Sequence, residues 1–319
     1  MVRVMKKLGR DPRGNASVLV SAAIVVLIGF CSLVVDMGNL FLAKHRLGNA
    51  LDAAVLAGCQ ELPDDPGGAL AVTKEYFAGN GMDSASLLSV DIGSDNKTVV
   101  ASGQATVQHF LAGLLGIQSS TLSDSAAARI EPLTGVRGVV PLGIKKQDLE
   151  FGVKYTLKIA SNTNFDEFLG PGTFGVIILD DGGSARYEEY FKYGFDGKVS
   201  VGDVFSTDNG NKSGATRDGI NYRVSQCTHA CTPGDFDPSC PRIIIIPVYE
   251  PAEPADPQPG DKIKKVRVVG MAAFLLDIPG DKVVGNESYV DGYFVQMVLE
   301  GESDPAGSDF GAYAIRLIQ

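Results

Sequence analysis

One uncharged stretch near the N-terminus constrains this chain more than any other feature. Residues 14–35 form a run of 22 residues, GNASVLVSAAIVVLIGFCSLVV, that contains no charged side chain. As an α-helix this run would be about 33 Å long, which matches the hydrocarbon core of a lipid bilayer. We therefore predict that residues 16–62 form a transmembrane helix with an extracytoplasmic extension, preceded by a short stub at 1–15.

The charges on either side of this run predict its orientation. The stub carries a net charge of +4, whereas the whole chain carries −10, so the remaining residues carry −14. Because basic residues tend to stay on the cytoplasmic side, we expect a single-pass protein of the cytoplasmic membrane with its N-terminus inside and an extracytoplasmic body. The acidic balance of that body argues against a nucleic-acid partner. A cleaved secretory signal is the alternative, but no A-x-A site follows the run.

Small and apolar residues form a regular stripe along the predicted helix. They recur in alternating steps of three and four residues, which places them on one helix face. This seam has two interpretations: a second helix packs on it, or the chain's own globular part does. A small-xxx-small pair inside the apolar run adds a weak association signal. The residues of this helix-packing seam are Ser17, Ser21, Leu40, Ala43, Leu47, Ala50, Ala54 and Ala57.

The same segment resembles a known family. After the apolar run the sequence fits the pattern D-x-G…L-x-x-A-x-D-A-A at Asp36, Gly38, Leu47, Ala50, Asp52, Ala53 and Ala54. Over residues 13–60 the chain is similar to TadE/TadG-like proteins of Flp (Tad) pilus assembly. The resemblance implies a single-pass membrane protein that takes part in assembling or anchoring a pilus-like filament. Its partners would be the membrane and other pilus-assembly or pilin-like subunits, with self-association as one form.

Two departures limit what the resemblance implies. Pseudopilins cut by a prepilin peptidase carry glutamate five residues after a glycine, whereas here Gly14 is followed at that place by Leu19. Processing at Gly14 therefore stays open. The D-x-S-x-S loop of larger TadG-like proteins is missing, so metal-dependent adhesion of that type is not predicted. Asp36 lies at the outer end of the apolar run, where we expect its carboxylate to reach water.

The body divides into two predicted units, and the fold class is α+β. Residues 63–133 should form a small α+β unit with a helix at about 68–79, a hairpin of 86–92 with 97–110, a helical turn at 109–116 and a returning strand at 119–133. By analogy, a long helix on a small sheet is the plan of pilin-like proteins. Residues 136–319 should form a mainly antiparallel sandwich or barrel-like domain with a helix near 184–193. Its expected strands are 136–144, 153–160, 174–180, 220–224, 242–249, 265–278, 289–299 and 310–318.

Cysteines provide the densest local signal in the body. Cys31 lies within the apolar run and is interpreted as a packed thiol. On the exported side, where disulfides persist, we expect one disulfide within the Cys227, Cys231 and Cys240 cluster, and a second bridge to Cys59 is an option. The alternative is a zinc site made by the three cluster thiolates and His229.

The sequence offers little support for an enzyme. A serine or cysteine nucleophile needs a histidine base, and the chain has three histidines: His45, His109 and His229. The G-x-S-x-G elbow, the P-loop and the HExxH motif are all missing. We therefore predict no catalytic residues and no cofactor. The alternative to a pilus-assembly protein is a membrane-tethered cell-surface binding module unrelated to pili.

Overall fold

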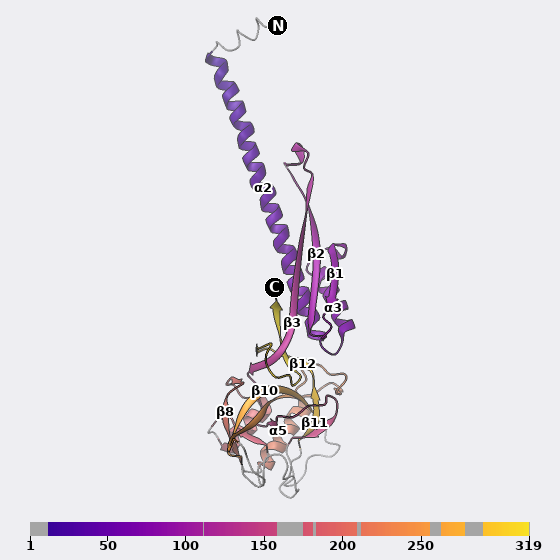
Figure 1. Ribbon diagram of the computed structural model, residues 1–319, viewed down its shortest axis with the longest axis vertical. Helices are drawn as coiled ribbons and strands as arrows, with labels where there is room; N and C mark the ends of the chain where they lie inside the picture. The colour runs from indigo at the N-terminus through magenta and orange to yellow at the C-terminus, as the bar shows by residue number, and fades with distance from the viewer. Residues whose placement is uncertain are drawn as a thin grey trace.

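A single long helix, α2 (Pro12–Gly58), begins the described part of the chain. The computed structural model describes residues 12–110, 112–157, 175–180, 183–208, 212–255, 263–277 and 290–318. The N-terminal half of α2 extends away from the rest of the molecule, and its C-terminal half lies against a sheet (Figure 1). The helix ends in a 3-10 turn, η1 (Cys59–Glu61), because Pro63 cannot continue it. The predicted long apolar helix is thus confirmed.

The C-terminal half of α2 packs on a seven-stranded sheet. The main path of this sheet is β1 (Leu87–Ile92), β2 (Thr98–Gln108), β3 (Ser119–Val136), β14 (Ala312–Ile318) and β12 (Met297–Val298), while β7 (Val199–Ser200) and β13 (Glu302–Ser303) pair with the far end of β3. A second helix, α3 (Pro66–Gly79), packs beside α2, and a 3-10 turn, η2 (Ser84–Ser86), leads into β1. The predicted hairpin of 86–92 with 97–110 is confirmed as the antiparallel pair β1–β2.

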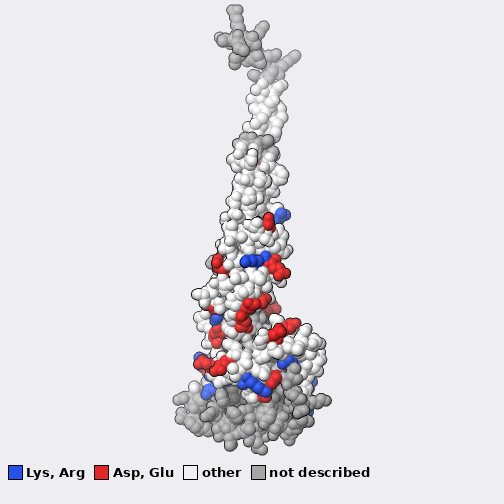
Figure 2. Space-filling view, turned by 90° about the vertical axis from the view of Figure 1, so that its right-hand side faces the viewer, with Lys and Arg blue, Asp and Glu red and all other residues white. Residues whose placement is uncertain are grey.

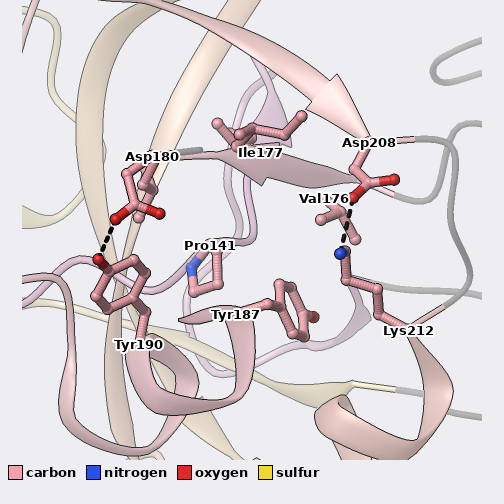
Figure 3. Close-up of a pocket in the computed structure, with 10 residues that line it drawn as sticks. Pro141, Val176, Ile177, Asp180, Tyr187, Tyr190, Asp208 and Lys212 are labelled. Carbon is pink, nitrogen blue, oxygen red and sulfur yellow. Dashed lines mark hydrogen bonds and ion pairs between the residues drawn. The ribbon is translucent and has the colours of Figure 1, made fainter. Parts of the chain in front are cut away.

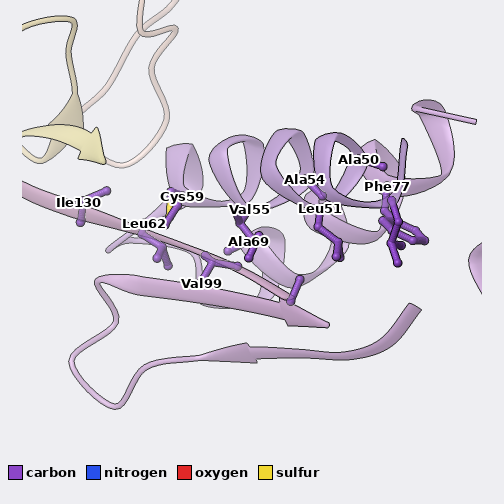
Figure 4. Close-up of a cluster of buried hydrophobic side chains, with 14 of the residues drawn as sticks. Ala50, Leu51, Ala54, Val55, Cys59, Leu62, Ala69, Phe77, Val99 and Ile130 are labelled. Carbon is purple, nitrogen blue, oxygen red and sulfur yellow. The ribbon is translucent and has the colours of Figure 1, made fainter. Parts of the chain in front are cut away.

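Buried apolar side chains join α2, α3 and this sheet into one core. Leu47, Leu51 and Val55 of α2 are fully buried, as are Phe77 of α3 and Val99 of β2. In Figure 4 Leu51, Val55, Phe77 and Val99 lie between the helix and the strands below it. The C-terminal half of α2 is therefore part of the folded body.

The second sheet forms the distal end of the molecule. Its main path is β4 (Ile144–Lys145), β9 (Ile243–Glu253), β10 (Lys265–Leu276), β11 (Asp291–Val295) and β5 (Lys154–Thr156), and β8 (Val204–Asp208) pairs with both β10 and β6 (Val176–Ile178). Two helices pack against each other beside it, α4 (Gly183–Tyr193) and α5 (Ser213–Gln226). The α+β class and the helix near 184–193 agree with the sequence-based prediction.

Two expected strands behave differently in the structure. Residues 220–224, predicted as a strand, lie inside α5, where Thr216, Gly219 and Ile220 are buried at helical spacing. A five-residue window is too short to show this period. Residues 136–144, also predicted as a strand, contribute mainly isolated bridges, for example at Val139.

The last strand joins the first sheet. Residues 310–318 were expected in the second unit, yet β14 pairs with β3 over Ala127–Pro132. The first sheet is therefore completed by the end of the chain, about 180 residues after β3. Sequence pattern alone could not show this, because strand partners far apart in the chain are chosen by topology.

Candidate functional site

Asp36 holds the tip of the β2–β3 hairpin against the long helix. Its two carboxylate oxygens accept hydrogen bonds from the backbone N–H groups of Phe110 and Ala112, each at 2.8 Å. Ala112 begins the 3-10 turn η3 (Ala112–Leu115), and a carboxylate is favoured at such an N-terminus. Asp36 is only 5% exposed. The expectation that its carboxylate reaches water is therefore wrong, because the hairpin folds back over it.

The hairpin tip presents apolar side chains beside the uncovered part of the helix. Phe110 is 71% exposed and Ile117 is 58% exposed. Figure 1 shows the tip pointing along α2 toward its N-terminal end. Figure 2 shows no charged side chain along this upper part of the molecule on the face in view. This surface was not predicted, although its signal is present in the sequence: residues 98–123 form a run of 26 residues without Asp, Glu, Lys or Arg.

The chain's own body covers the C-terminal part of the helix seam. Leu47, Ala50, Ala54 and Ala57 are buried, and the first three belong to the core shared with α3 and the first sheet. These side chains are thus covered by α3 and the first sheet of the same chain. Leu40 and Ala43 are half-buried, while Ser17 and Ser21 are exposed. The Ser21 hydroxyl donates to the Ser17 carbonyl oxygen at 2.8 Å, a bond within the helix.

Asp52, another residue of the family pattern, lies close to a second carboxylate. Partial burial and the charge of Asp124 on β3 together raise the pKa of Asp52. At acidic pH, below the pKa of Asp52 in the unfolded chain, the Asp52 carboxyl is neutral in both the folded and the unfolded state. It then has no effect on stability. As pH rises past that value, ionisation is less favourable in the folded state, so the folded state loses stability.

We therefore expect Asp52→Asn to stabilise the protein at neutral pH, by less than about 1 kcal/mol because solvent screens the pair. The gain should vanish at about pH 3, where the wild-type carboxyl is also protonated. Thermal unfolding at the two pH values measures it, with Asp91→Asn on exposed strand β1 as the control. An equal gain at both pH values would contradict the electrostatic cause.

Three cysteine sulfurs meet at one end of the second sheet. The Sγ atoms of Cys227, Cys231 and Cys240 all lie within 4.8 Å of one another, and those of Cys227 and Cys240 are 3.5 Å apart. Cys231 and Cys240 are buried, and Cys227 is half-buried. The loop between α5 and β9 thus folds into a thiol cluster, the name used below for these three side chains.

The surroundings of the thiol cluster affect its ionisation. Burial opposes ionisation of Cys227, but hydrogen bonds with the His229 backbone and with Cys240, Arg242 and Cys231 together place its pKa below the usual thiol value. Burial raises the pKa of Cys240 to about 12. Of these two thiols, Cys227 therefore ionises first.

The expected disulfides are not formed in the structure. All five cysteines are free, and the sulfurs of Cys227 and Cys240, 3.5 Å apart, are beyond bonding distance. Cys59 belongs to the core under α2, whereas the thiol cluster packs in a separate apolar cluster, so the optional bridge to Cys59 is also wrong. Burial raises the pKa of Cys59 to about 12, which suits an inert packed thiol. Cys31 is exposed on the uncovered part of α2.

A cavity of about 220 Å³ opens beside β6 and α4, but its residues do not form a catalytic arrangement (Figure 3). The Tyr190 hydroxyl donates to Asp180, and Lys212 pairs with Asp208 at 2.9 Å. Among the described lining residues there is no histidine, cysteine or serine, so no nucleophile–base pair is built there. We assign this cavity no chemistry. Its described lining comprises Pro141, Val176, Ile177, Ile178, Leu179, Asp180, Tyr187, Tyr190, Asp208 and Lys212.

Comparison with known proteins identifies the N-terminal segment. Residues 14–65 match the family model Tad, described as "Putative Flp pilus-assembly TadE/G-like". The matched residues contain the apolar run, Asp36 and the buried half of α2. No curated protein and no solved structure matches the chain. The resemblance drawn from the sequence is confirmed for this segment, and the match supports involvement in Flp pilus assembly.

Proposed function

We propose that this protein is a membrane-anchored, non-enzymatic component of Flp-type pilus assembly that acts through helix packing and extracytoplasmic protein contacts. One observation carries the proposal. The segment that matches the pilus-assembly family coincides with a single helix that is apolar and uncovered at one end and built into a folded core at the other. Such a helix can anchor the folded body in the membrane and hold it where it contacts protein partners.

The uncovered half of α2 has the properties of a membrane anchor. The helix from Ala16 to Glu61 contains an 18-residue window with a mean hydropathy of 2.9, and none of that window is buried by the protein. A core helix of this composition would be covered by other elements. Apolar surface left in water costs roughly 25 cal/mol per Å², so lipid is the environment that stabilises it.

Asp36 and the hairpin tip would mark the outer boundary of the bilayer. The carboxylate follows directly after the uncharged run, and it holds Phe110 and Ala112 at the same level of the helix. The exposed Phe110 and Ile117 side chains would then contact lipid beside the helix. Apolar side chains such as phenylalanine bury favourably at the boundary of the acyl chains.

The hairpin contact can be tested with a single fluorophore, because the chain has no tryptophan. In full-length protein reconstituted into liposomes, Phe110→Trp should give fluorescence that brominated lipids quench strongly. Tyr193→Trp, at a residue 65% exposed on α4, is the matched control and should stay unquenched. An unquenched Trp at 110 in protein that co-floats with the liposomes would contradict the tip contact but not the anchor.

The predicted orientation follows from the two oppositely charged ends of the chain. A stub of net charge +4 should remain in the cytoplasm, and the acidic body should lie outside. We expect the protein to remain in the membrane fraction after a high-salt wash, and protease added to protoplasts to digest the body. A released form lacking residues 1–40, or a body spared by protease, would contradict the proposal.

Partner contacts would come from the helix face that the body leaves uncovered. Between Asp36 and the core, the apolar side chains of Met37, Phe41 and Leu42 are exposed. We expect loss of the gene to abolish Flp-type filaments, and a chain with Phe41 and Leu42 both changed to Ser to insert normally yet fail to restore them. Normal filaments in the gene deletion would favour a surface binding module instead.

A further inference from the structure

The thiol cluster combines the ligand type and the spacing of a metal site. Zinc–thiolate bonds of about 2.3 Å place tetrahedral sulfurs about 3.8 Å apart. The sulfurs of Cys227 and Cys240 are 3.5 Å apart, and all three lie within 4.8 Å. Shifts of less than about 1 Å would therefore bring the three sulfurs to one ion. The three sulfurs come together because the loop between α5 and β9 folds back on itself.

A buried arginine, Arg242, lies beside the thiol cluster, and its positive charge needs a compensating negative charge. Arg242 is 3% exposed, and its guanidinium donates to the carbonyl oxygens of Cys231, at 3.1 Å, and Leu276, at 2.7 and 2.9 Å. Within the described part of the chain, no carboxylate forms an ion pair with it. A buried charge of this kind is costly unless it is compensated. Three thiolates around a divalent cation carry a net charge of −1, which Arg242 would balance.

From these two observations we propose that Cys227, Cys231 and Cys240 bind one zinc-type, thiophilic cation through three thiolates. The site belongs to the distal sheet, so the inference does not depend on the proposed membrane role. Binding replaces the thiol protons, which pass to solvent, and forms three metal–sulfur bonds. Buried Leu275 and Val295 pack around the cluster and keep bulk water from its inner side.

His229 is not needed as a fourth ligand. Its side chain is 60% exposed, and its Nδ1 lies 4.0 Å from a carboxylate oxygen of Asp237. The three sulfurs lie within 4.8 Å of one another, and the His229 ring is not part of that group. The exposed loop at Thr228 and Ala230 leaves the outer side of the cluster open to water, which can supply the fourth ligand.

Cobalt titration of the full-length, reduced protein in detergent tests the site directly. We expect the strong near-ultraviolet thiolate-to-cobalt charge-transfer band to saturate at one ion per chain, and zinc to abolish it by displacement. Cys227→Ser should lower the affinity at least about 100-fold, and this half-buried position tolerates a hydroxyl without loss of the fold. Cys59→Ala, which removes a buried thiol elsewhere, should bind cobalt as the wild type does.

A histidine variant and thermal unfolding test the site further. His229→Ala should bind cobalt within about threefold of the wild type, and zinc should raise the unfolding temperature of wild type but not of Cys227→Ser. A weak spectrum without charge transfer, or equal binding by Cys227→Ser, would overturn the site. A loss in His229→Ala as large as in Cys227→Ser would overturn the three-thiolate assignment. A Cys227–Cys240 disulfide in protein extracted from membranes without reductant would overturn it as well.

Discussion

Replacing Asp36 with alanine should release the tip of the β2–β3 hairpin while the rest of the body stays folded. The carboxylate is buried and accepts hydrogen bonds from the backbone N–H groups of Phe110 and Ala112. A hydrogen bond to a charged group contributes about 1.5–3 kcal/mol, so without the carboxylate the tip should open and both N–H groups should bind water instead. Amide hydrogen exchange of the full-length protein in detergent should become at least about tenfold faster at these two residues.

Matched variants separate this effect from a general loss of stability. Asp36→Asn retains one carbonyl oxygen as an acceptor, so exchange at the tip should be intermediate. Asp91→Ala removes an exposed carboxylate from the same sheet and should leave the tip protected. Amides at the base of the hairpin, such as Val99 and Ala128, should keep their protection in all three variants. Unchanged exchange at Phe110 and Ala112 in Asp36→Ala would contradict the assigned role.

Gly58→Leu should destabilise the whole body. A Cβ atom at Gly58 would lie 2.1 Å from the Thr73 hydroxyl oxygen and 2.9 Å from the Ala69 carbonyl oxygen. The Thr73 hydroxyl is buried and already donates to that carbonyl at 2.7 Å, so α3 would have to move away from α2. Overpacking of this kind costs about 3 kcal/mol. The unfolding temperature should fall by roughly 6–12 °C.

Gly38→Leu is the control for this substitution. Both glycines lie in α2, and leucine raises helix propensity by a similar amount at each, by about 0.8 kcal/mol. A Cβ atom at Gly38 would meet nothing within 4 Å. We expect its unfolding temperature to equal that of the wild type or exceed it. Equal unfolding temperatures for the two variants would show that close packing of α2 on α3 does not limit stability.

The thiol cluster shows how far sequence reasoning reaches at a candidate site. The spacing of Cys227, Cys231 and Cys240 identified the residues correctly as a local group, and it offered a disulfide or a metal site. The structure separates the sulfurs beyond bonding distance and turns His229 outward. Arg242 had no signal in the sequence, because a lone arginine before a strand shows nothing about its burial or about the groups that surround it.

The sequence by itself determined the long apolar helix, the β1–β2 hairpin and the segment related to pilus assembly. Each depends on residues that are neighbours in the chain, so length, polarity and turn residues are sufficient. Only the tertiary structure decided that the C-terminal part of the helix seam is covered by the chain's own body, that β14 returns to β3, and that Asp36 caps a hairpin some 75 residues away. These contacts join distant residues, and the free energy that selects among the possible partners comes from packing the whole body at once.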